Sequence, residues 1–520
     1  MKQFNLTGDP WIPVLWRNGR RSEVPLPELF ERGGEIADLA VPPAERIVLM
    51  RLLLCIVMRS MQEQEKLPEY PADWLELTSD LIAKHAAEYL RKWRDAFDLY
   101  GDRAFLQANG LARQNNASQD KLDFTLASGN NHTLFDHAAN EDGRTHSDAW
   151  LARKLLVSQS FSTGGTIGQN IWNGVPVPNS SGASPLMEGS PLHVFCLGQN
   201  ILETLHLNLI FLAELNKIKL GVPVWEAPPD GPAKAQEFDT TLFGRLVPIS
   251  RAVKLTGDSS RVTVAEACRY SKLPNFTDPY LSNKKSKDKK AEEKILYLGI
   301  YPDRHPWREL ESLLTLAGPG PGSGVTPPKN LLVKKYLPRE SILRLWCGGV
   351  AAKKANYTFT GEWTLSLPVW KISRSEFILD LFDFTKNAER IEGVIKTHID
   401  LFWDTLSEIR KAGSSKNREI RNESRKSSLT SEQKRELDAS RLREYWSRLN
   451  RAVPRFLAEE NEDVDFVPLY KQLKSIALDS FRENLPSSSP WHLMACGKIM
   501  PFFRSELGKI INPYLPKGEI

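Results

Sequence analysis

Apolar residues recur every three or four positions from about residue 377 to the end of the chain. One such stripe runs from Ala388 to Ile409 and falls on one face of a long helix. Three more stripes follow, marked by Leu442, Trp446, Leu449, Val453 and Phe456, by Leu469, Leu473, Ile476 and Phe481, and by Ile499, Phe503, Leu507 and Ile510. Amphipathic helices must cover each other's apolar faces. Residues 377–520 are therefore predicted to form a C-terminal four-helix bundle.

Capping and breaking residues indicate where these helices begin and bend. Ser489 followed by Pro490 is typical of a helix start, and Thr430 fits the first position of a capping box. Pro454 predicts a kink in the second helix, because proline cannot donate its backbone hydrogen bond. The polar and basic residues 411–429 are predicted to form the loop before that helix.

Residues 1–370 show no single periodicity and mix predicted helices with predicted strands. We expect a strand at 11–14, helices at 44–62, 71–97 and 147–156, a buried apolar run at 192–196 followed by a helix ending near Leu215, and short β-rich runs with turns over 240–375. The predicted fold class is therefore α+β. It combines a large mixed N-terminal domain, residues 1–370, with the C-terminal bundle, residues 377–520.

Three stretches of the N-terminal part are predicted to be irregular. Residues 101–189 are rich in Gly, Asn and Ser apart from the helix expected at 147–156, and loops this long are typical of functional or disordered segments. Residues 317–328 are dominated by Gly and Pro and predict an ordered bend or a mobile linker. The lysine-rich run 284–294 predicts either a solvated hairpin tip or a contact with nucleic-acid phosphates.

The composition of the 520-residue chain is typical of soluble globular proteins. Apolar residues make up 41% and charged residues 26%, which excludes collagen-like, low-complexity and wholly disordered classes. A net charge of +5 permits a nucleic-acid partner without requiring one, because a local patch matters more than the sum. We find no signal peptide and no apolar run of the about 20 residues that a membrane span needs. We therefore expect a cytoplasmic protein.

The residues that usually carry catalysis form no strong pattern. The sequence contains no P-loop, GxSxG, HExxH or EF-hand motif. Its five cysteines are scattered and never form a CxxC pair, which argues against a disulfide scaffold or a four-cysteine zinc site.

One local cluster has metal-binding residue types: His132, Asp136, His137, His146 and Asp148. His132 and His137 are five positions apart, which places them on different faces of a helix or a strand. An ordered polar loop is the favoured interpretation, and a metal-dependent nuclease stays as the alternative. The residues alone favour no enzyme activity, no cofactor and no metal.

Four further residues invite a functional interpretation but fit a structural one. His193 lies in an apolar run and is predicted to be a core histidine, while Asp9 is predicted to cap a turn. Trp225 and Trp307 are predicted to pack inside the protein.

Several segments, taken in order, resemble the CasA family, the large subunit of the type I-E CRISPR surveillance complex, Cascade. They are NLTGDPWIPV (5–14), NNHTLFDH (130–137), SSGASP (180–185) ahead of LHVF (192–195), and Gly348-Gly349 followed by KKA (353–355). Smaller signs are FLQ (105–107), NILETL (200–205) and PVWE (223–226). The resemblance covers the chain from about residue 4 to its end, since the family also closes with a four-helix bundle.

The resemblance implies a non-catalytic role in RNA-guided antiviral defence. The family's large subunit recognises the PAM, the short motif beside the target, and helps to open the duplex for guide-RNA pairing. It also provides the docking surface for the recruited helicase–nuclease. The implied partners are the other Cascade subunits, the 5′ handle region of the guide CRISPR RNA, double-stranded target DNA and that helicase–nuclease, with no membrane. Sequence is then recognised by guide pairing, while the protein recognises only the PAM and the shape of the backbone.

In the family, a loop of small residues enters the DNA minor groove. The matching positions here are Asn179, Ser180, Ser181, Gly182, Ala183 and Ser184. Small side chains let the backbone approach base edges, and the minor groove mainly separates A·T from G·C pairs. The resemblance therefore implies tolerance of several PAMs. The alternative is an ordinary Ser/Gly surface loop.

The family's wedge lies just after the Gly-Gly pair and matches Lys353, Lys354 and Ala355. Better-known members carry Asn-Gln where this chain has two lysines, which implies binding through charge rather than through amide geometry. A solvated basic turn is the alternative. The family also uses a lysine near the PAM, for which Lys272, Lys284 and Lys285 are the candidates. Some members carry a cysteine cluster that Cys268 alone does not reproduce.

A third family loop inserts into the rest of the complex. It matches Asn130, Asn131, His132, Thr133, Leu134, Phe135 and Asp136. Leu134 and Phe135 would be the apolar anchors, which suits interface chemistry, or else ordinary core residues. Outside the family, the open alternatives are a general nucleic-acid-binding subunit and a scaffold that binds only proteins.

Overall fold

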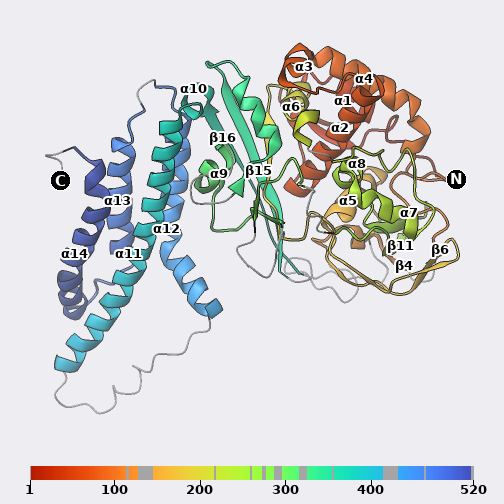
Figure 1. Cartoon of the computed structure of the whole chain (residues 1–520). Helices are drawn as coiled ribbons and strands as arrows, with labels where there is room; N and C mark the ends of the chain where they lie inside the picture. Colours follow the sequence, from red (N-terminus) through yellow and green to blue (C-terminus); the bar gives the residue numbers. More distant parts are fainter. Residues whose placement is uncertain are drawn as a thin grey trace. The chain divides into compact units, whose positions relative to one another are not determined.

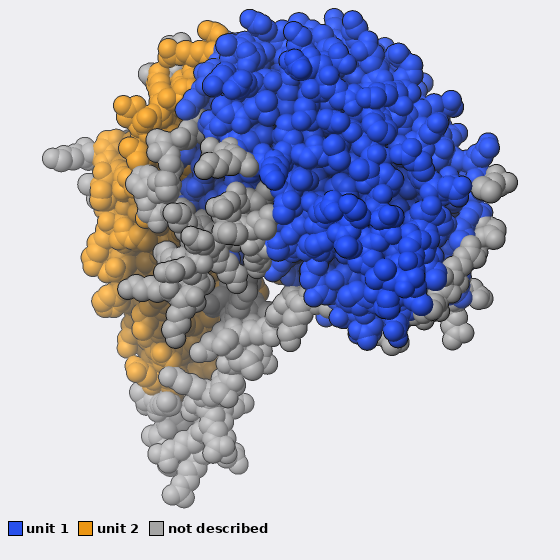
Figure 2. All heavy atoms as spheres, turned by 45° about the vertical axis from the view of Figure 1, so that its right-hand side comes forward, with its two compact units in different colours: residues 1–302, 312–338, 343–364 blue, residues 303–311, 339–342, 365–520 orange. Residues whose placement is uncertain are grey.

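The computed structural model describes residues 2–112, 116–126, 144–215, 218–257, 260–271, 277–285, 295–315, 325–353, 356–413, 431–461 and 464–516. For residues 116, 284, 285, 295, 353, 411–413 and 431–439 it describes the backbone only. The chain divides into two compact units (Figure 2). Unit 1 holds residues 1–302, 312–338 and 343–364, and unit 2 holds residues 303–311, 339–342 and 365–520. Helices and strands are mixed in the first unit and helices dominate the second, which confirms the α+β class.

The strands of the described chain form several small sheets (Figure 1). Three-stranded sheets have the orders β2-β1-β3, β10-β11-β4, β13-β12-β14 and β16-β15-β9, and two-stranded sheets pair β5 with β8 and β6 with β7. Their bounds are β1 Ile12–Trp16, β2 Arg21–Val24, β3 Ile36–Leu39, β4 Asn116–Ser118, β5 Gly165–Thr166, β6 Asn170–Trp172, β7 Val175–Val177, β8 Ser180–Ser181, β9 His193–Leu197, β10 Arg251–Leu255, β11 Arg261–Glu266, β12 Asn283–Lys285, β13 Ile295–Tyr297, β14 Val325–Thr326, β15 Ile342–Lys353 and β16 Asn356–Pro368.

The helices that precede the long C-terminal ones are mostly short. They are α1 Leu26–Glu31, α2 Pro43–Glu63, α3 Pro71–Glu76, α4 Ser79–Lys92, α5 Asp148–Phe161, α6 Ile201–Leu207, α7 Pro232–Gln236, α8 Leu242–Leu246 and α9 Leu310–Leu314. The predicted start of α2 is confirmed, with Pro42 at the N-cap and Pro43 in the first turn. No helix in the described ranges is long and apolar enough to cross a membrane.

Helix α2 is the core element of unit 1 and is buried on nearly every side. Even Arg51 on this helix is buried. Its guanidinium donates to a carboxylate oxygen of Asp278 at 2.7 Å and to the backbone oxygen of Arg245 at 2.8 Å. A buried charge requires such partners. The predicted core histidine His193 is also fully buried, and so is the indole of Trp225, which donates to the Tyr89 hydroxyl.

Two predicted helices are shorter than the sequence indicated. The single helix expected over 71–97 was wrong, because Leu77 is extended and the Thr78 side chain caps a new helix by accepting from the backbone of Leu81. The helix expected to end near Leu215 stops at Leu207. The Asn208 side chain there bonds the backbone of Cys196 instead.

The prediction of only short strands over 240–375 was wrong for β15 and β16, which are 12 and 13 residues long. Two adjacent glycines, Gly348 and Gly349, lie inside β15. A Cβ on Gly348 would lie 2.4 Å from the ring of Trp346, and one on Gly349 would lie 2.7 Å from the backbone oxygen of Pro191. These glycines therefore allow close packing within a continuous strand and do not interrupt it.

Unit 2 contains α10 Val369–Ile372, α11 Ser375–Gly413, α12 Ser431–Ala458, α13 Val467–Glu483 and α14 Pro490–Ile511. Helix α11 packs against α14 and α13, and α12 packs against α13 (Figure 1). The predicted start of α14 is confirmed, because the Ser489 side chain accepts from the backbone of His492 and Pro490 follows it. Pro454 lies inside α12. Thr430 and residues 414–429 lie outside the described residues.

The four predicted stripes are buried in unit 2, with one exception. Phe481 of α13 stacks on Phe503 of α14 with ring centroids 4.0 Å apart. The exception is Ile476, which is half-buried and lines a groove between α12 and α13.

A short segment from the preceding part of the chain joins these helices. Residues 303–311 belong to unit 2, and within them Trp307 is fully buried. Its indole donates to the Asn450 side chain at 2.8 Å, and the guanidinium of the neighbouring Arg308 lies 3.7 Å from the ring centre of Trp446. The predicted packing role of Trp307 is confirmed.

Candidate nucleic-acid interface

The small-residue loop 179–184 is held against a second glycine-rich segment. Strand β8 pairs with β5, with Ser181 opposite Gly165 and Ser180 opposite Thr166. The backbone oxygen of Asn179 also accepts from the backbone of Ile167 at 2.8 Å. Asn179, Ser180 and Ala183 are exposed, whereas Ser181 and Gly182 are half-buried. The loop therefore presents small polar and apolar side chains on a fixed backbone.

Glycine is required where the two segments meet. A Cβ on Gly164 would lie 3.0 Å from the backbone nitrogen of Ala183 and from the backbone oxygen of Ser181. Gly165 has a φ of +156°, which side-chain-bearing residues rarely adopt. The sequence Thr163-Gly164-Gly165 therefore folds against the loop because it lacks side chains.

Ser184 anchors the end of the loop instead of facing solvent. It is fully buried, and its hydroxyl lies 2.7 Å from that of Ser250. The Ser250 hydroxyl donates to the backbone oxygen of Gln159 at 2.6 Å, and the Gln159 side chain bonds the backbone of Arg251 on both sides. This network ties the loop to helix α5 and strand β10.

Arg251 lies buried directly beneath the loop. Its guanidinium donates to the backbone oxygen of Gly182 at 2.7 Å and to that of Thr163 at 3.3 Å. Burial lowers the pKa of Arg251 to about 10, while nearby Glu266 opposes this shift. The group therefore stays charged at neutral pH. It crosslinks the loop to the glycine-rich segment.

Glu266, at the end of β11, holds the loop from its other side. Its buried carboxylate accepts from the backbone N–H of Gly182 at 3.1 Å. The same carboxylate binds Arg269 through two bonds of 2.9 Å. These bonds raise the pKa of Arg269, whose side chain is 58% exposed. One carboxylate thus fixes both the loop and a solvent-facing cation beside it.

The sequence did not identify Arg269 as a site residue. Its guanidinium lies 3.4 Å from the backbone oxygen of Ser180, and its backbone is held on both sides by the Gln236 side chain. The sequence signal that could have indicated Arg269 is its position three residues after the acidic Glu266, at the end of a β-rich run. The predicted lysine in this region, Lys272, lies outside the described residues.

The wedge positions follow a strand of the longest hairpin in the described chain. Lys353 ends β15, and β16 begins at Asn356. Only Lys354 and Ala355 stand between them in the sequence, and both lie outside the described residues, as does the Lys353 side chain. Nearby, the backbone of Ala352 donates to the Ser190 hydroxyl at 3.1 Å.

Other predicted residues are placed only in part. Lys284 and Lys285 belong to β12, which pairs antiparallel with β13, so residues 286–294 connect two paired strands. The side chains of both lysines and residues 286–294 lie outside the described residues. So does the whole predicted docking loop: Asn130, Asn131, His132, Thr133, Leu134, Phe135 and Asp136.

The described members of the histidine cluster have separate partners. The ring of His146 lies 2.6 Å from a carboxylate oxygen of Asp120 and stacks on Trp150. Asp148 accepts from the Tyr100 hydroxyl and pairs with Lys2. Among the described residues, no group of three metal-ligating side chains comes together. His132, Asp136 and His137 lie outside them.

The arrangement around residues 179–184 is suited to binding. It combines exposed small side chains, a backbone fixed by buried charges and one exposed guanidinium. Such a surface can approach base edges and phosphates closely.

A family model and several solved structures match nearly the whole chain, and a curated relative matches part of it. The family model of the CRISPR-associated protein Cse1 matches residues 5–485. A CRISPR-associated protein CasA/Cse1 from Thermus thermophilus is 32% identical over 334 residues. That match spans 61% of this chain and 61% of the relative's length.

Solved structures show the same fold. Thermus thermophilus CasA superposes with a TM-score of 0.74 at 24% identity, covering 98% of this chain and 100% of that one. Thermobifida fusca Cse1 gives 0.76 at 20% identity, covering 99% of each chain. A chain from a CRISPR RNA-guided surveillance complex gives 0.66 at 18% identity, covering 98% and 100%. The protein belongs to the CasA/Cse1 family of CRISPR-associated proteins.

Proposed function

We propose that this chain is the large, non-catalytic subunit of a type I-E CRISPR surveillance complex, Cascade, working in the cytoplasm. Membership of the CasA/Cse1 family and a fold shared with a chain of an RNA-guided surveillance complex support this role. Its proposed partners are the other subunits, the 5′ handle of the guide RNA, the target duplex and a recruited helicase–nuclease. Residues 130–136 are proposed to insert into the complex through Leu134 and Phe135.

The proposed task of the loop 179–184 is to recognise the PAM in the minor groove. The observation that carries this proposal is the pair of buried charges, Glu266 and Arg251, that fix the loop backbone while Asn179 and Ser180 stay exposed. A loop held before DNA arrives pays no ordering entropy on binding. In an ordinary surface loop, no gain in binding would offset the desolvation free energy of the two buried charges.

The chemistry of the site fits limited sequence discrimination. Small side chains detect groove width and the guanine amino group, and the minor groove distinguishes mainly A·T from G·C pairs. Arg269 adds an exposed cation beside Ser180, within reach of a phosphate or of a narrow groove. We therefore expect several related PAMs to be accepted.

The proposed wedge and lysine contacts assist opening of the duplex. Lys353, Lys354 and Ala355 would lie at the end of the β15–β16 hairpin, whose long paired strands give a rigid support. Lys272, Lys284 and Lys285 are proposed to contact phosphates nearby. Each such contact would steepen the salt dependence of binding by about 0.9.

Base analogues test the minor-groove proposal directly. Replacing guanine by inosine in the PAM removes the minor-groove amino group, whereas 7-deazaguanine alters only the major groove. The affinity of the guide-loaded complex should change about 5- to 150-fold with inosine, given that one good base contact contributes about 1–3 kcal/mol. It should stay unchanged with 7-deazaguanine. The opposite pattern would overturn minor-groove recognition.

A matched pair of variants assigns the effect to the loop. Ser180→Trp places bulk on an exposed loop position and should abolish the PAM preference. Ser487→Trp makes the same change at an exposed position of unit 2 and should leave it intact. Equal PAM preference in both variants would place recognition elsewhere.

A further inference from the structure

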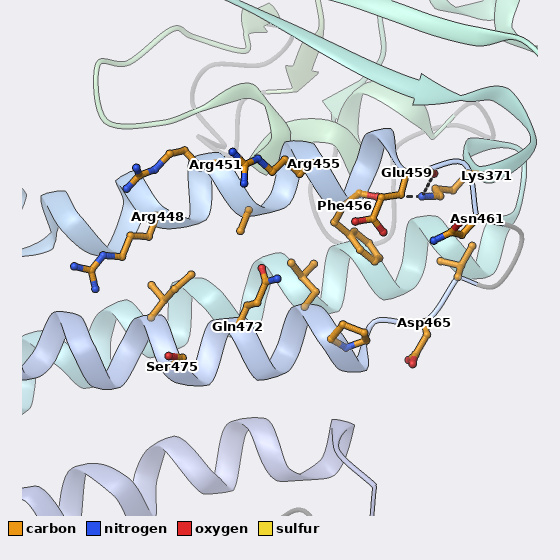
Figure 3. Close-up of a pocket in the computed structure, with 15 residues that line it drawn as sticks. Lys371, Arg448, Arg451, Arg455, Phe456, Glu459, Asn461, Asp465, Gln472 and Ser475 are labelled. Carbon is orange, nitrogen blue, oxygen red and sulfur yellow. Dashed lines mark hydrogen bonds between the residues drawn. The ribbon is translucent and has the colours of Figure 1, made fainter.

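A groove between α12 and α13 is a cavity that the proposed function leaves unused. It has a volume of about 680 Å³ and is lined by both helices, by the segment that joins them and by Lys371. Figure 3 shows Arg448, Arg451 and Arg455 following one another along α12, with Gln472 and Ser475 on α13. All of these residues belong to unit 2.

The arginines are not needed to stabilise the end of their own helix. The ammonium group of Lys371 already donates to the backbone oxygen of Phe456 at 3.0 Å and to that of Glu459 at 2.7 Å (Figure 3). These carbonyls are the ones that a helix leaves unpaired at its C-terminus. Arg455 is therefore available for another partner.

Two of the three arginines form no ion pair with the residues that the structure describes. Arg448 is held by Glu483 at 2.5 Å. Arg451 and Arg455 are exposed, and within the described ranges they form no ion pair. They lie four positions apart on one helix, where like charges repel. The repulsion would be relieved by an anionic ligand that spans both groups.

The rest of the groove indicates what kind of ligand this is. The apolar side chains of Phe456, Leu469 and Ile476 also line the groove, so a ligand that fills it carries apolar groups beside its anions. At the far end, Glu459 and Asp465 line the groove and would repel a continuous phosphate backbone. Charges of opposite sign at the two ends favour a polypeptide over a nucleic-acid strand.

The spacing fits a helix laid along the groove. Arg451 and Arg455 are four positions apart, or about 6 Å along α12. A helix with carboxylates three or four residues apart places them about 5–6 Å apart along its axis, and its adjacent face can carry apolar side chains. Arginine binds carboxylates through two parallel bonds, which fixes the register of such a segment.

We propose that the α12–α13 groove binds an acidic, amphipathic helical segment of another polypeptide, with its carboxylates on Arg451 and Arg455 and its apolar face on Phe456, Leu469 and Ile476. The inference rests on the proposed function in one respect, since the surveillance complex supplies the partner polypeptides.

Photo-crosslinking in the assembled complex tests this inference. The exposed Gln472 is replaced by the photo-reactive residue benzoylphenylalanine, and the exposed Lys498 on α14 serves as the control position. Irradiation of the purified guide-loaded complex, followed by mass spectrometry, should identify a polypeptide segment with carboxylates at three- or four-residue spacing. The Lys498 position should not capture that segment.

Charge reversal then tests the role of the arginines. Arg451→Glu with Arg455→Glu should reduce the crosslink from position 472 at least tenfold. Arg443→Glu with Arg504→Glu makes the same change of charge at exposed positions outside the groove and should leave the yield within twofold.

Four results would overturn the inference: capture of nucleic acid, capture of a segment without acidic residues, no crosslink, or a yield that charge reversal does not change. Assembly is measured separately on a sizing column before irradiation. If the chain assembles and binds PAM-bearing DNA but gives no such crosslink, only the proposed binding of a segment in the groove is disproved. A chain that does not assemble disproves the proposed function and the groove together.

Discussion

Replacing Glu266 by glutamine removes the charge that fixes the loop 179–184. In the structure this carboxylate accepts from the backbone N–H of Gly182 and binds Arg269 twice. Glutamine has nearly the same size and keeps one acceptor oxygen. The variant therefore tests the charge and leaves the packing of β11 in place.

The expected loss follows from the bonds that change. A hydrogen bond to a charged acceptor contributes about 1.5–3 kcal/mol and one to a neutral acceptor about 0.5–1.5 kcal/mol. The bond to Gly182 should therefore weaken by about 1–2 kcal/mol. The pair with Arg269 adds little to this sum because the Arg269 side chain is mostly exposed. If the loop must be ordered to bind, about 1–2 kcal/mol corresponds to a 5- to 30-fold loss of affinity.

The assay is the affinity of the guide-loaded complex for duplexes with an intact and with a scrambled PAM, at one fixed salt concentration. Glu266→Gln should weaken binding to the intact PAM and reduce the preference for it. The affinity for the scrambled duplex should stay the same or increase, because Arg269 is released from the carboxylate of Glu266 and can contact phosphates. Glu237→Gln is the control, since it breaks an exposed ion pair with Lys234.

Affinity and PAM preference of Glu266→Gln within twofold of the wild type would refute the reasoning. A thermal melt of the isolated chain accompanies the assay. Equal losses for both duplexes together with a much lower melting temperature would mean that Glu266 supports only the fold.

Three further predictions follow from other parts of the chain. Lys353→Ala with Lys354→Ala should weaken binding to PAM-bearing duplexes and lower the salt slope by up to about 1.8, and an unchanged slope on a relaxed, matched target would count against the wedge. Phe135→Ala should loosen assembly because it removes an apolar anchor, and full stoichiometry on a sizing column would disprove that role. Burial lowers the pKa of His193 to about 3, so the folded protein holds it neutral while the unfolded chain is protonated below about pH 6.5. The stability that depends on neutral His193 is complete above pH 6.5 and is lost as the pH falls toward 3. Between pH 7 and 5 the free energy of unfolding of the wild type should therefore fall by about 2 kcal/mol more than that of His193→Leu. Equal losses in the two proteins would contradict this prediction.

The elements that the sequence predicted best were those whose own residues determine them. Helix α2 starts at Pro42-Pro43 and α14 at Ser489-Pro490, because cap and proline act locally. The apolar stripes of the long helices are buried because only one face of each can be covered. The break at Leu77 was missed, since a Thr cap inside a helical pattern gives a weaker signal than proline does.

The candidate site was predicted only where a motif marked it. The loop 179–184 followed from family resemblance, but the charges beneath it did not. Glu266 and Arg251 belong to β-rich runs where charged residues are normally expected to face solvent, and here tertiary structure folds them under a loop about 70 to 85 positions away in the sequence. Periodicity along one segment carries no information about such long-range contacts.

Duplex binding by the guide-loaded complex, prepared with and without this chain, tests the central claim most directly. Targets with an intact and with a scrambled PAM are compared at the same salt concentration. The account predicts tight binding only when both the chain and the intact PAM are present. Binding of the intact target that is equally tight without the chain would contradict it, and so would equal binding of both targets with the chain present.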